Sequence, residues 1–122
     1  MKCLVKNESA VGLTLKEKEK PSPKDNEILI KVKKAAICGT DLHIWNWDSW
    51  AQEKIKPPMT VGHEFMGVIE EVGKKIKNFK IGDRVSVESH ITGTKSRNAR
   101  AGKLHLDPDT VCLLYTSDAA DE

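Results

Sequence analysis

The sequence is built from short apolar segments that glycine, proline or charged residues soon interrupt, and this pattern limits the chain to a fold of short strands. The clearest segment spans residues 27–36, in which Ile28, Ile30 and Val32 recur at every second position, the period of a strand with one buried face. Shorter strands are predicted at residues 1–6, 12–15, 60–61, 65–72 and 83–88. Because short strands must pack together to bury an apolar face, the sequence predicts a compact, mostly β domain of barrel type.

Length and composition restrict the chain to one folded domain. Its 122 residues are 39% hydrophobic and 31% charged, the balance of an ordinary soluble globular protein. No apolar run has the length of a signal peptide or of a membrane span, so we expect a cytoplasmic protein that does not bind membranes. Three scattered cysteines do not make a disulfide framework and fit a reducing compartment.

Charge and glycine spacing argue against two other kinds of function. The net charge is +2, and the lysine clusters are interleaved with acidic residues and lack an aromatic stacking pattern, so nucleic-acid binding is not expected. The chain contains no Gly-x-Gly-x-x-Gly motif, which indicates that this stretch lacks a dinucleotide-binding Rossmann domain.

The last segment, residues 112–122, shows neither helical nor strand periodicity. One choice of codons for it reproduces a transposase adapter used to prepare sequencing libraries, so we interpret it as a non-native tail. The natural sequence would then end near Val111, and residues 1–111 would be a truncated domain. A divergent but genuine carboxyl terminus is the alternative.

Two turns carry residues that could hold a metal ion. Cys38 follows the strand predicted at residues 27–36, and His63 and Glu64 precede the next long strand. A thiolate, an imidazole and a carboxylate are a ligand set for catalytic zinc, which keeps a fourth position open for water or substrate. Gly62 and Gly67 would permit close approach of the backbone around His63. By spacing alone, however, packing is the commoner role of such residues.

A short helix is predicted to follow Cys38 through residues 42–44, with Thr40 or Asp41 as its cap. This position before a helix favours the thiolate form of Cys38, which is the form that binds metal. Residues 45–58 have no strong periodicity and are predicted to form a loop, whose tryptophans pack against a neighbouring domain or subunit.

Three segments taken together resemble the zinc-dependent medium-chain alcohol dehydrogenase family. Residues 62–73 resemble its zinc-binding signature, residues 36–43 its first ligand loop and residues 81–85 its next strand. Residues 46–52 and 88–92 further resemble the L-threonine 3-dehydrogenase branch of that family. The resemblance covers nearly all of residues 1–111.

The resemblance implies both a fold and a site. The fold is the GroES-like, partly open barrel of the family's amino-terminal catalytic domain. The implied site residues are the zinc ligands Cys38, His63 and Glu64, the proton relay of Thr40 and His43, and a histidine of the substrate pocket, His90. Other readings stay open, since Thr40 could be only a helix cap, His43 a surface residue and His90 a structural residue at a strand end.

The implied activity is oxidation of the secondary alcohol of L-threonine to 2-amino-3-oxobutanoate, with zinc as Lewis acid and NAD as hydride acceptor. NAD would bind to the missing domain, so this chain alone is expected to be inactive, and nothing in it distinguishes NAD from NADP. The partner is a small-molecule substrate, and the full-length protein is expected to be a homo-oligomer, a tetramer by resemblance. The alternatives are a zinc polyol or diol dehydrogenase, or a metal-free, non-enzymatic GroES-like module for binding or assembly.

The sequence departs from the family at a second metal site. Family members commonly carry a structural zinc held by four cysteines, but those positions here are Gly93, Ser96, Ala99 and Asp107, while their neighbours keep the family pattern. The structural zinc is therefore predicted to be lost. A metal held by Asp107, His90 and His105 is the alternative, although these residues supply no thiolate.

Overall fold

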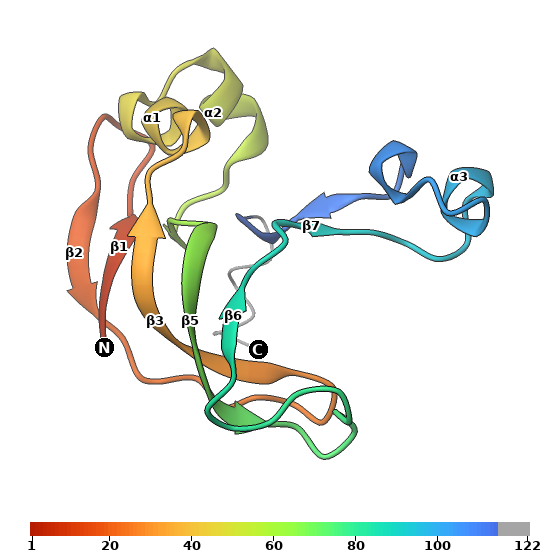
Figure 1. Cartoon of the computed structure of the whole chain (residues 1–122). Helices are drawn as coiled ribbons and strands as arrows, with labels where there is room; N and C mark the ends of the chain where they lie inside the picture. The colour runs from red at the N-terminus through yellow and green to blue at the C-terminus, as the bar shows by residue number, and fades with distance from the viewer. Residues whose placement is uncertain (115–122) are drawn as a thin grey trace.

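The computed structural model describes residues 1–114, which form two three-stranded sheets and one two-stranded sheet, all antiparallel (Figure 1). In the first sheet, β1 (Lys2–Lys6) lies between β2 (Thr14–Glu17) and β4 (Met59–Thr60). In the second, β5 (Glu64–Val72) lies between β3 (Ile28–Ala36) and β6 (Arg84–Ser86). The third pairs β7 (His90–Ile91) with β8 (Val111–Cys112). The predicted mostly β architecture is confirmed.

The helices are short and occupy two places. Helices α1 (Gly39–Asn46) and α2 (Ser49–Lys54) lie together at one end of the sheets (Figure 1). Helix α3 (Arg97–Arg100) and the 3-10 helix η1 (Leu104–Leu106) lie in a lobe that projects away from the sheets (Figure 1). Among the described residues, no helix has both the length and the apolar character needed to cross a bilayer.

Helix α2 lies inside the segment that was predicted to be a loop, so that prediction was wrong for residues 49–54. The Asp48 side chain accepts a hydrogen bond from the Ala51 backbone N–H at 3.0 Å, which caps the helix at its N-terminus. Trp47 before it adopts the left-handed conformation, with φ of 53°, and ends α1. A helix of six residues is too short to show a hydrophobic period, which is why the pattern was missed.

Helix α1 begins two or three residues earlier than predicted, since its cap is neither Thr40 nor Asp41. Cys38 is the N-cap residue, and the Asp41 carboxylate accepts a hydrogen bond from the Cys38 backbone N–H at 2.9 Å. Thr40 and Asp41 therefore lie inside the first turn, and Asp41 supports the helix start from within. The bond also fixes the backbone that carries the Cys38 thiol.

A hydrophobic core joins the two helices to the strands beneath them. Its buried members are Ile44, Ala51, Ile55, Met59 and Leu114. The tryptophans of this segment were predicted to pack against a neighbouring domain or subunit. Trp47 and Trp50 instead pack against the core of their own domain. Trp45 is 47% exposed and remains a candidate for an external contact.

The first residues of the supposed tail take part in the fold. Cys112 pairs with His90 across β7 and β8, and Leu114 is fully buried in the core. The remaining residues, 115–122, lie outside the described part of the chain. The origin of residues 112–122 stays a prediction.

The longest strand pair, β3 with β5, depends on a glycine at its centre. Gly67 pairs with Val32, and a β-carbon placed on Gly67 would lie 2.4 Å from the Lys31 carbonyl oxygen and 2.6 Å from Ile30 Cγ2. The expected close approach of the backbone is therefore present at Gly67. Gly62 differs, since it has open space around it but a φ of 120°, which disfavours a side chain for conformational reasons.

We predict that Gly67→Ala lowers the free energy of unfolding by about 2 kcal/mol, because the added methyl group overlaps backbone atoms of the neighbouring strand. Chemical denaturation of the chain and of the variant measures the difference. Gly39→Ala is the matched control, because a β-carbon there meets no atom within 4 Å. Equal destabilisation by both substitutions would contradict the packing argument.

One buried carboxylate organises the projecting lobe. Asp107 is 6% exposed, and it accepts hydrogen bonds from the backbone N–H groups of Gly93 at 2.6 Å and Asp109 at 3.4 Å. The Ser96 hydroxyl, followed by these backbone donors, holds the pKa of Asp107 below its usual value. Ser96 in turn accepts from the Ala99 N–H at 3.0 Å and caps α3. The four positions that would hold a structural zinc are thus joined by hydrogen bonds.

We predict that the lobe loosens in acid. Because the pKa of Asp107 is lowered in the folded chain, its ionised bonds stabilise the lobe above the unfolded pKa of about 3.9 and are lost as pH falls through the folded value. Hydrogen-exchange protection of the Gly93 and Ala99 amides should therefore fall in that pH range. Asp107→Asn should show weak protection already at neutral pH, whereas Asp109→Asn should behave as the unmodified chain. Constant protection down to about pH 2 would refute the role of Asp107.

Candidate metal centre

The three predicted zinc ligands come together in the structure. Cys38 follows β3, while His63 and Glu64 stand at the start of β5, and the pairing of Ala36 with Glu64 places these strand ends side by side. Each residue offers one ligand atom, and these atoms all lie within 4.8 Å of one another. Within residues 1–114 this is the one group of three such residues that could share an ion.

A buried carboxylate stands behind the histidine of this group. His63 is 6% exposed and Asp41 is 8% exposed, and His63 Nδ1 lies 3.5 Å from Asp41 Oδ1. Neither of these two atoms has a hydrogen-bond partner in the described structure. A histidine that binds metal through Nε2 usually donates its other N–H to a carboxylate, and the Asp41 carboxylate stands on the Nδ1 side of His63, where that donor would be. The residues therefore fit a zinc ion with sulfur, nitrogen and oxygen donors.

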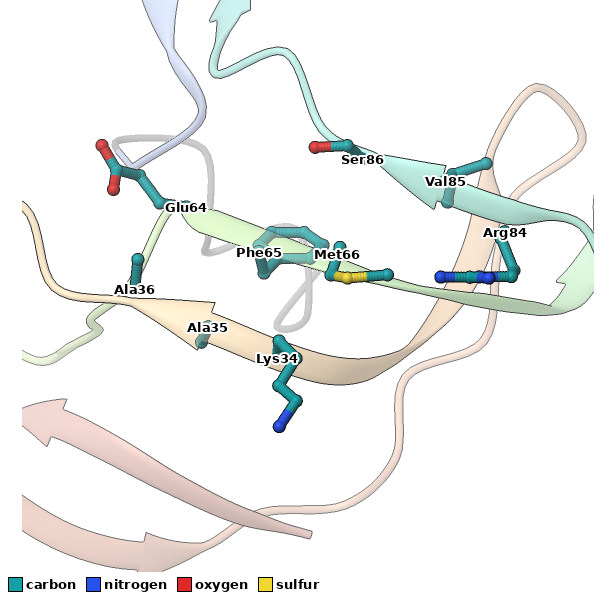
Figure 2. Close-up of a pocket in the computed structure, with 9 residues that line it drawn as sticks. All are labelled: Lys34, Ala35, Ala36, Glu64, Phe65, Met66, Arg84, Val85 and Ser86. Carbon is teal, nitrogen blue, oxygen red and sulfur yellow. The ribbon is translucent and has the colours of Figure 1, made fainter.

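Glu64 has a different environment from its two partners. Figure 2 shows it at one end of a hollow over β3, β5 and β6, with its carboxylate extending away from the cations Lys34 and Arg84. The hollow has a volume of about 630 Å³, which is of the size that holds small molecules. The remaining lining residues are Ala35, Ala36, Phe65, Met66, Val85 and Ser86. The Glu64 carboxylate therefore remains available to a metal at the edge of a mostly apolar surface.

The two residues of the predicted proton relay both lie on α1. Thr40 is half-buried, and its hydroxyl oxygen lies 3.7 Å from Cys38 Sγ. His43 is one helical turn further along, so both side chains can share a face of the helix. The His43 side chain is 55% exposed, and its Nδ1 forms a hydrogen bond with Asp48 Oδ2. Thr40 is thus close to Cys38, a candidate metal ligand, and His43 is in contact with solvent.

His90 lies apart from this group on β7. It is exposed, and its Nδ1 lies 2.8 Å from Glu88 Oε1, an interaction that is the main cause of a lowered pKa at Glu88. His105 is exposed in η1. The described residues bring neither histidine into a group of three ligands with Asp107. The assignment of His90 to a substrate pocket stays a prediction.

Sequence reasoning missed the contact between Asp41 and His63. The sequence pattern indicates only a capping role for Asp41, which stands three residues after the candidate ligand Cys38. A buried carboxylate that both binds the Cys38 backbone and faces His63 links the two ligand loops. The hydrogen bond between His43 and Asp48 was missed for another reason, because it depends on the unpredicted helix α2.

Comparisons with known proteins show the family of the chain. The model of the alcohol dehydrogenase GroES-like domain matches residues 24–116. The L-threonine 3-dehydrogenases of Burkholderia vietnamiensis (strain G4 / LMG 22486) and Burkholderia multivorans (strain ATCC 17616 / 249) are each 54% identical to the chain over 111 residues. The match covers 91% of this chain and 32% of each relative, so the chain spans about a third of their length.

Solved structures show the same fold. An alcohol dehydrogenase from Thermus sp. ATN1 matches with a TM-score of 0.77 and 28% identity, over 94% of this chain and 32% of that protein. The 2R,3R-butanediol dehydrogenase from Bacillus subtilis matches with a TM-score of 0.75 and 28% identity, over 95% of this chain and 34% of that protein. These matches confirm the predicted GroES-like fold and the resemblance to L-threonine 3-dehydrogenases. The chain therefore belongs to the zinc-dependent medium-chain alcohol dehydrogenase family.

Proposed function

We propose that this chain is the zinc-binding catalytic part of an NAD-linked dehydrogenase that oxidises the secondary alcohol of L-threonine to 2-amino-3-oxobutanoate. The observation that carries the proposal is the convergence of Cys38, His63 and Glu64, with Asp41 behind the histidine. The 54% identity to L-threonine 3-dehydrogenases supports the choice of substrate. The exposed position of Glu64 beside a hollow of small-molecule size supports access of that substrate.

The residues of the chain divide the chemistry among them. Cys38, His63 and Glu64 would hold the zinc, which when bound acts as a Lewis acid on the substrate hydroxyl. Oxidation removes a hydride from the carbinol carbon and a proton from the hydroxyl. The Thr40 hydroxyl would accept that proton while it donates its own to His43, and His43 would release a proton to water, a task suited to an exposed imidazole. The hydride goes to a nicotinamide cofactor held by a part of the protein outside this chain.

The wider setting follows from the same proposal. The three cysteines are free thiols, which suits a reducing cytoplasm. The full-length enzyme is proposed to be a homo-oligomer, and exposed apolar residues such as Trp45 offer surfaces for its further contacts. His90 is proposed to line the substrate pocket in the complete protein.

A diol dehydrogenase is the second candidate. The butanediol dehydrogenase of Bacillus subtilis has the same fold at 28% identity, and a site with Cys38, His63 and Glu64 would serve either substrate. The L-threonine dehydrogenase is preferred because residues 46–52 carry the resemblance to that branch of the family. Asp48 in this segment forms a hydrogen bond with His43 of the proposed relay. The remaining candidate is a metal-free module. Such a module does not account for the buried carboxylate of Asp41 that faces the His63 imidazole.

We predict that the purified chain binds about one zinc ion and that Cys38→Ala abolishes this binding, because the thiolate is the strongest ligand of the three. Elemental analysis after dialysis against a weak chelator measures the zinc content. Cys112→Ala is the matched control, because Cys112 is not among the three ligands, and it should retain the metal. A folded chain that never takes up zinc would favour the metal-free module.

We predict that the chain alone does not reduce NAD with L-threonine, whereas its fusion to the remaining two-thirds of a relative restores turnover. The absorbance of NADH measures the rate, with L-threonine and butane-2,3-diol compared as substrates. A fusion that prefers the diol would support the second candidate. A folded, zinc-loaded fusion that reduces NAD with neither substrate would refute both.

A further inference from the structure

One carboxylate joins helices α1 and α2 next to the proposed proton relay. Asp48 Oδ1 accepts the Ala51 N–H at 3.0 Å and caps α2, while Asp48 Oδ2 forms a hydrogen bond with His43 Nδ1 on α1. The two oxygens therefore have separate partners on separate helices. The cap fixes the carboxylate to the backbone, and the second oxygen then meets the imidazole from a fixed direction.

The surroundings of Asp48 hold it in this position. Trp47 accepts a hydrogen bond from the Gln52 side chain at 2.9 Å through its backbone oxygen, and the Lys6 ammonium lies 4.9 Å from the centre of the Trp47 ring. Ala51, whose N–H binds Asp48, is fully buried in the core. On the other side, the His43 ring lies 5.7 Å from the Trp50 ring. The side chains of His43 and Asp48 are 55% and 37% exposed, but the segment that carries Asp48 is anchored on both sides by these contacts.

The contact determines which nitrogen of His43 carries the proton. The hydrogen bond to His43 is the largest cause that lowers the pKa of Asp48, so this carboxylate is ionised at neutral pH. An ionised carboxylate only accepts hydrogen bonds, and therefore Nδ1 of His43 must donate. In the neutral ring Nε2 is then the acceptor. A proton that arrives from Thr40 can be taken up only at that nitrogen.

We propose that Asp48 is a positioning residue that fixes the tautomer and the ring orientation of His43, so that Nε2 accepts the substrate proton. This inference rests on the proposed relay of Thr40 and His43. During transfer the proton binds Nε2, the Nδ1–H bond to Asp48 stabilises the imidazolium, and Nε2 then releases the proton to water. The 55% exposure of the His43 side chain gives water access to the ring.

The test separates the two roles of Asp48 by substitution. Asp48→Ser retains an N-cap oxygen for Ala51 but offers no carboxylate to His43, whereas Asp48→Ala removes both. Nitrogen-15 spectra of the histidine rings in the chain, recorded about two pH units above the usual histidine pKa of about 6.5, report the tautomer. We expect the Nδ1–H form of His43 in the unmodified chain and the Nε2–H form in Asp48→Ser. If Asp48→Ser keeps the Nδ1–H form, the proposal is overturned, whatever the activity of the protein.

The fused enzyme provides the second measurement. Asp48→Ser should lower kcat about tenfold and leave KM for L-threonine nearly unchanged, because the substrate does not touch Asp48 in the proposed relay. Asp48→Asn should restore part of the rate, since its amide oxygen can accept from Nδ1. An unchanged kcat in Asp48→Ser would overturn the positioning role. A fused enzyme that is inactive without any substitution would refute the proposed function instead, and the ring spectra would still decide the tautomer.

Discussion

The pairing of β3 with β5 is the constraint on which the rest of the structure depends. Its last register pair, Ala36 with Glu64, places the end of one strand beside the start of the other, so both ligand loops leave the sheet at the same edge. Gly67 makes this possible because its neighbours occupy the space that a side chain would need. The candidate metal centre is therefore a consequence of backbone pairing, and the side chains of Cys38 and His63 complete it.

The site also depends on the small core beneath α1 and α2. Ile44 and Ala51 are fully buried there and pack the two helices into the core that Met59 of β4 shares. Asp41 and Asp48, near the N-termini of these helices, face His63 and His43 respectively. Each histidine near the site thus has a carboxylate on its Nδ1 side, and each carboxylate also binds a backbone N–H of its helix. Helix formation and imidazole orientation are coupled through these two residues.

The strands and the grouping of Cys38, His63 and Glu64 could be predicted from the sequence, but the contacts around them could not. The alternation of Ile28, Ile30 and Val32 shows a strand directly, and the ligand set is carried by motifs that are local in the chain. Helix α2 could not be predicted because its six residues make less than two helical turns, too few to show a hydrophobic period. The contact of Asp41 with His63 could not be predicted because the two residues are 22 positions apart in the chain. The register of two paired strands brings them together, and no local sequence pattern encodes that register.

The hydrogen-bonded lobe gives the protein a distinct chemical tolerance. Residues 92–110 contain neither cysteine nor methionine, and their order depends on oxygen and nitrogen atoms centred on Asp107. A site of four thiolates is destroyed when peroxide oxidises its sulfur, and it competes with other proteins for scarce zinc. Within residues 92–110 an oxidant therefore meets no sulfur atom, and the thiols open to oxidation lie elsewhere in the chain, at Cys3, Cys38 and Cys112.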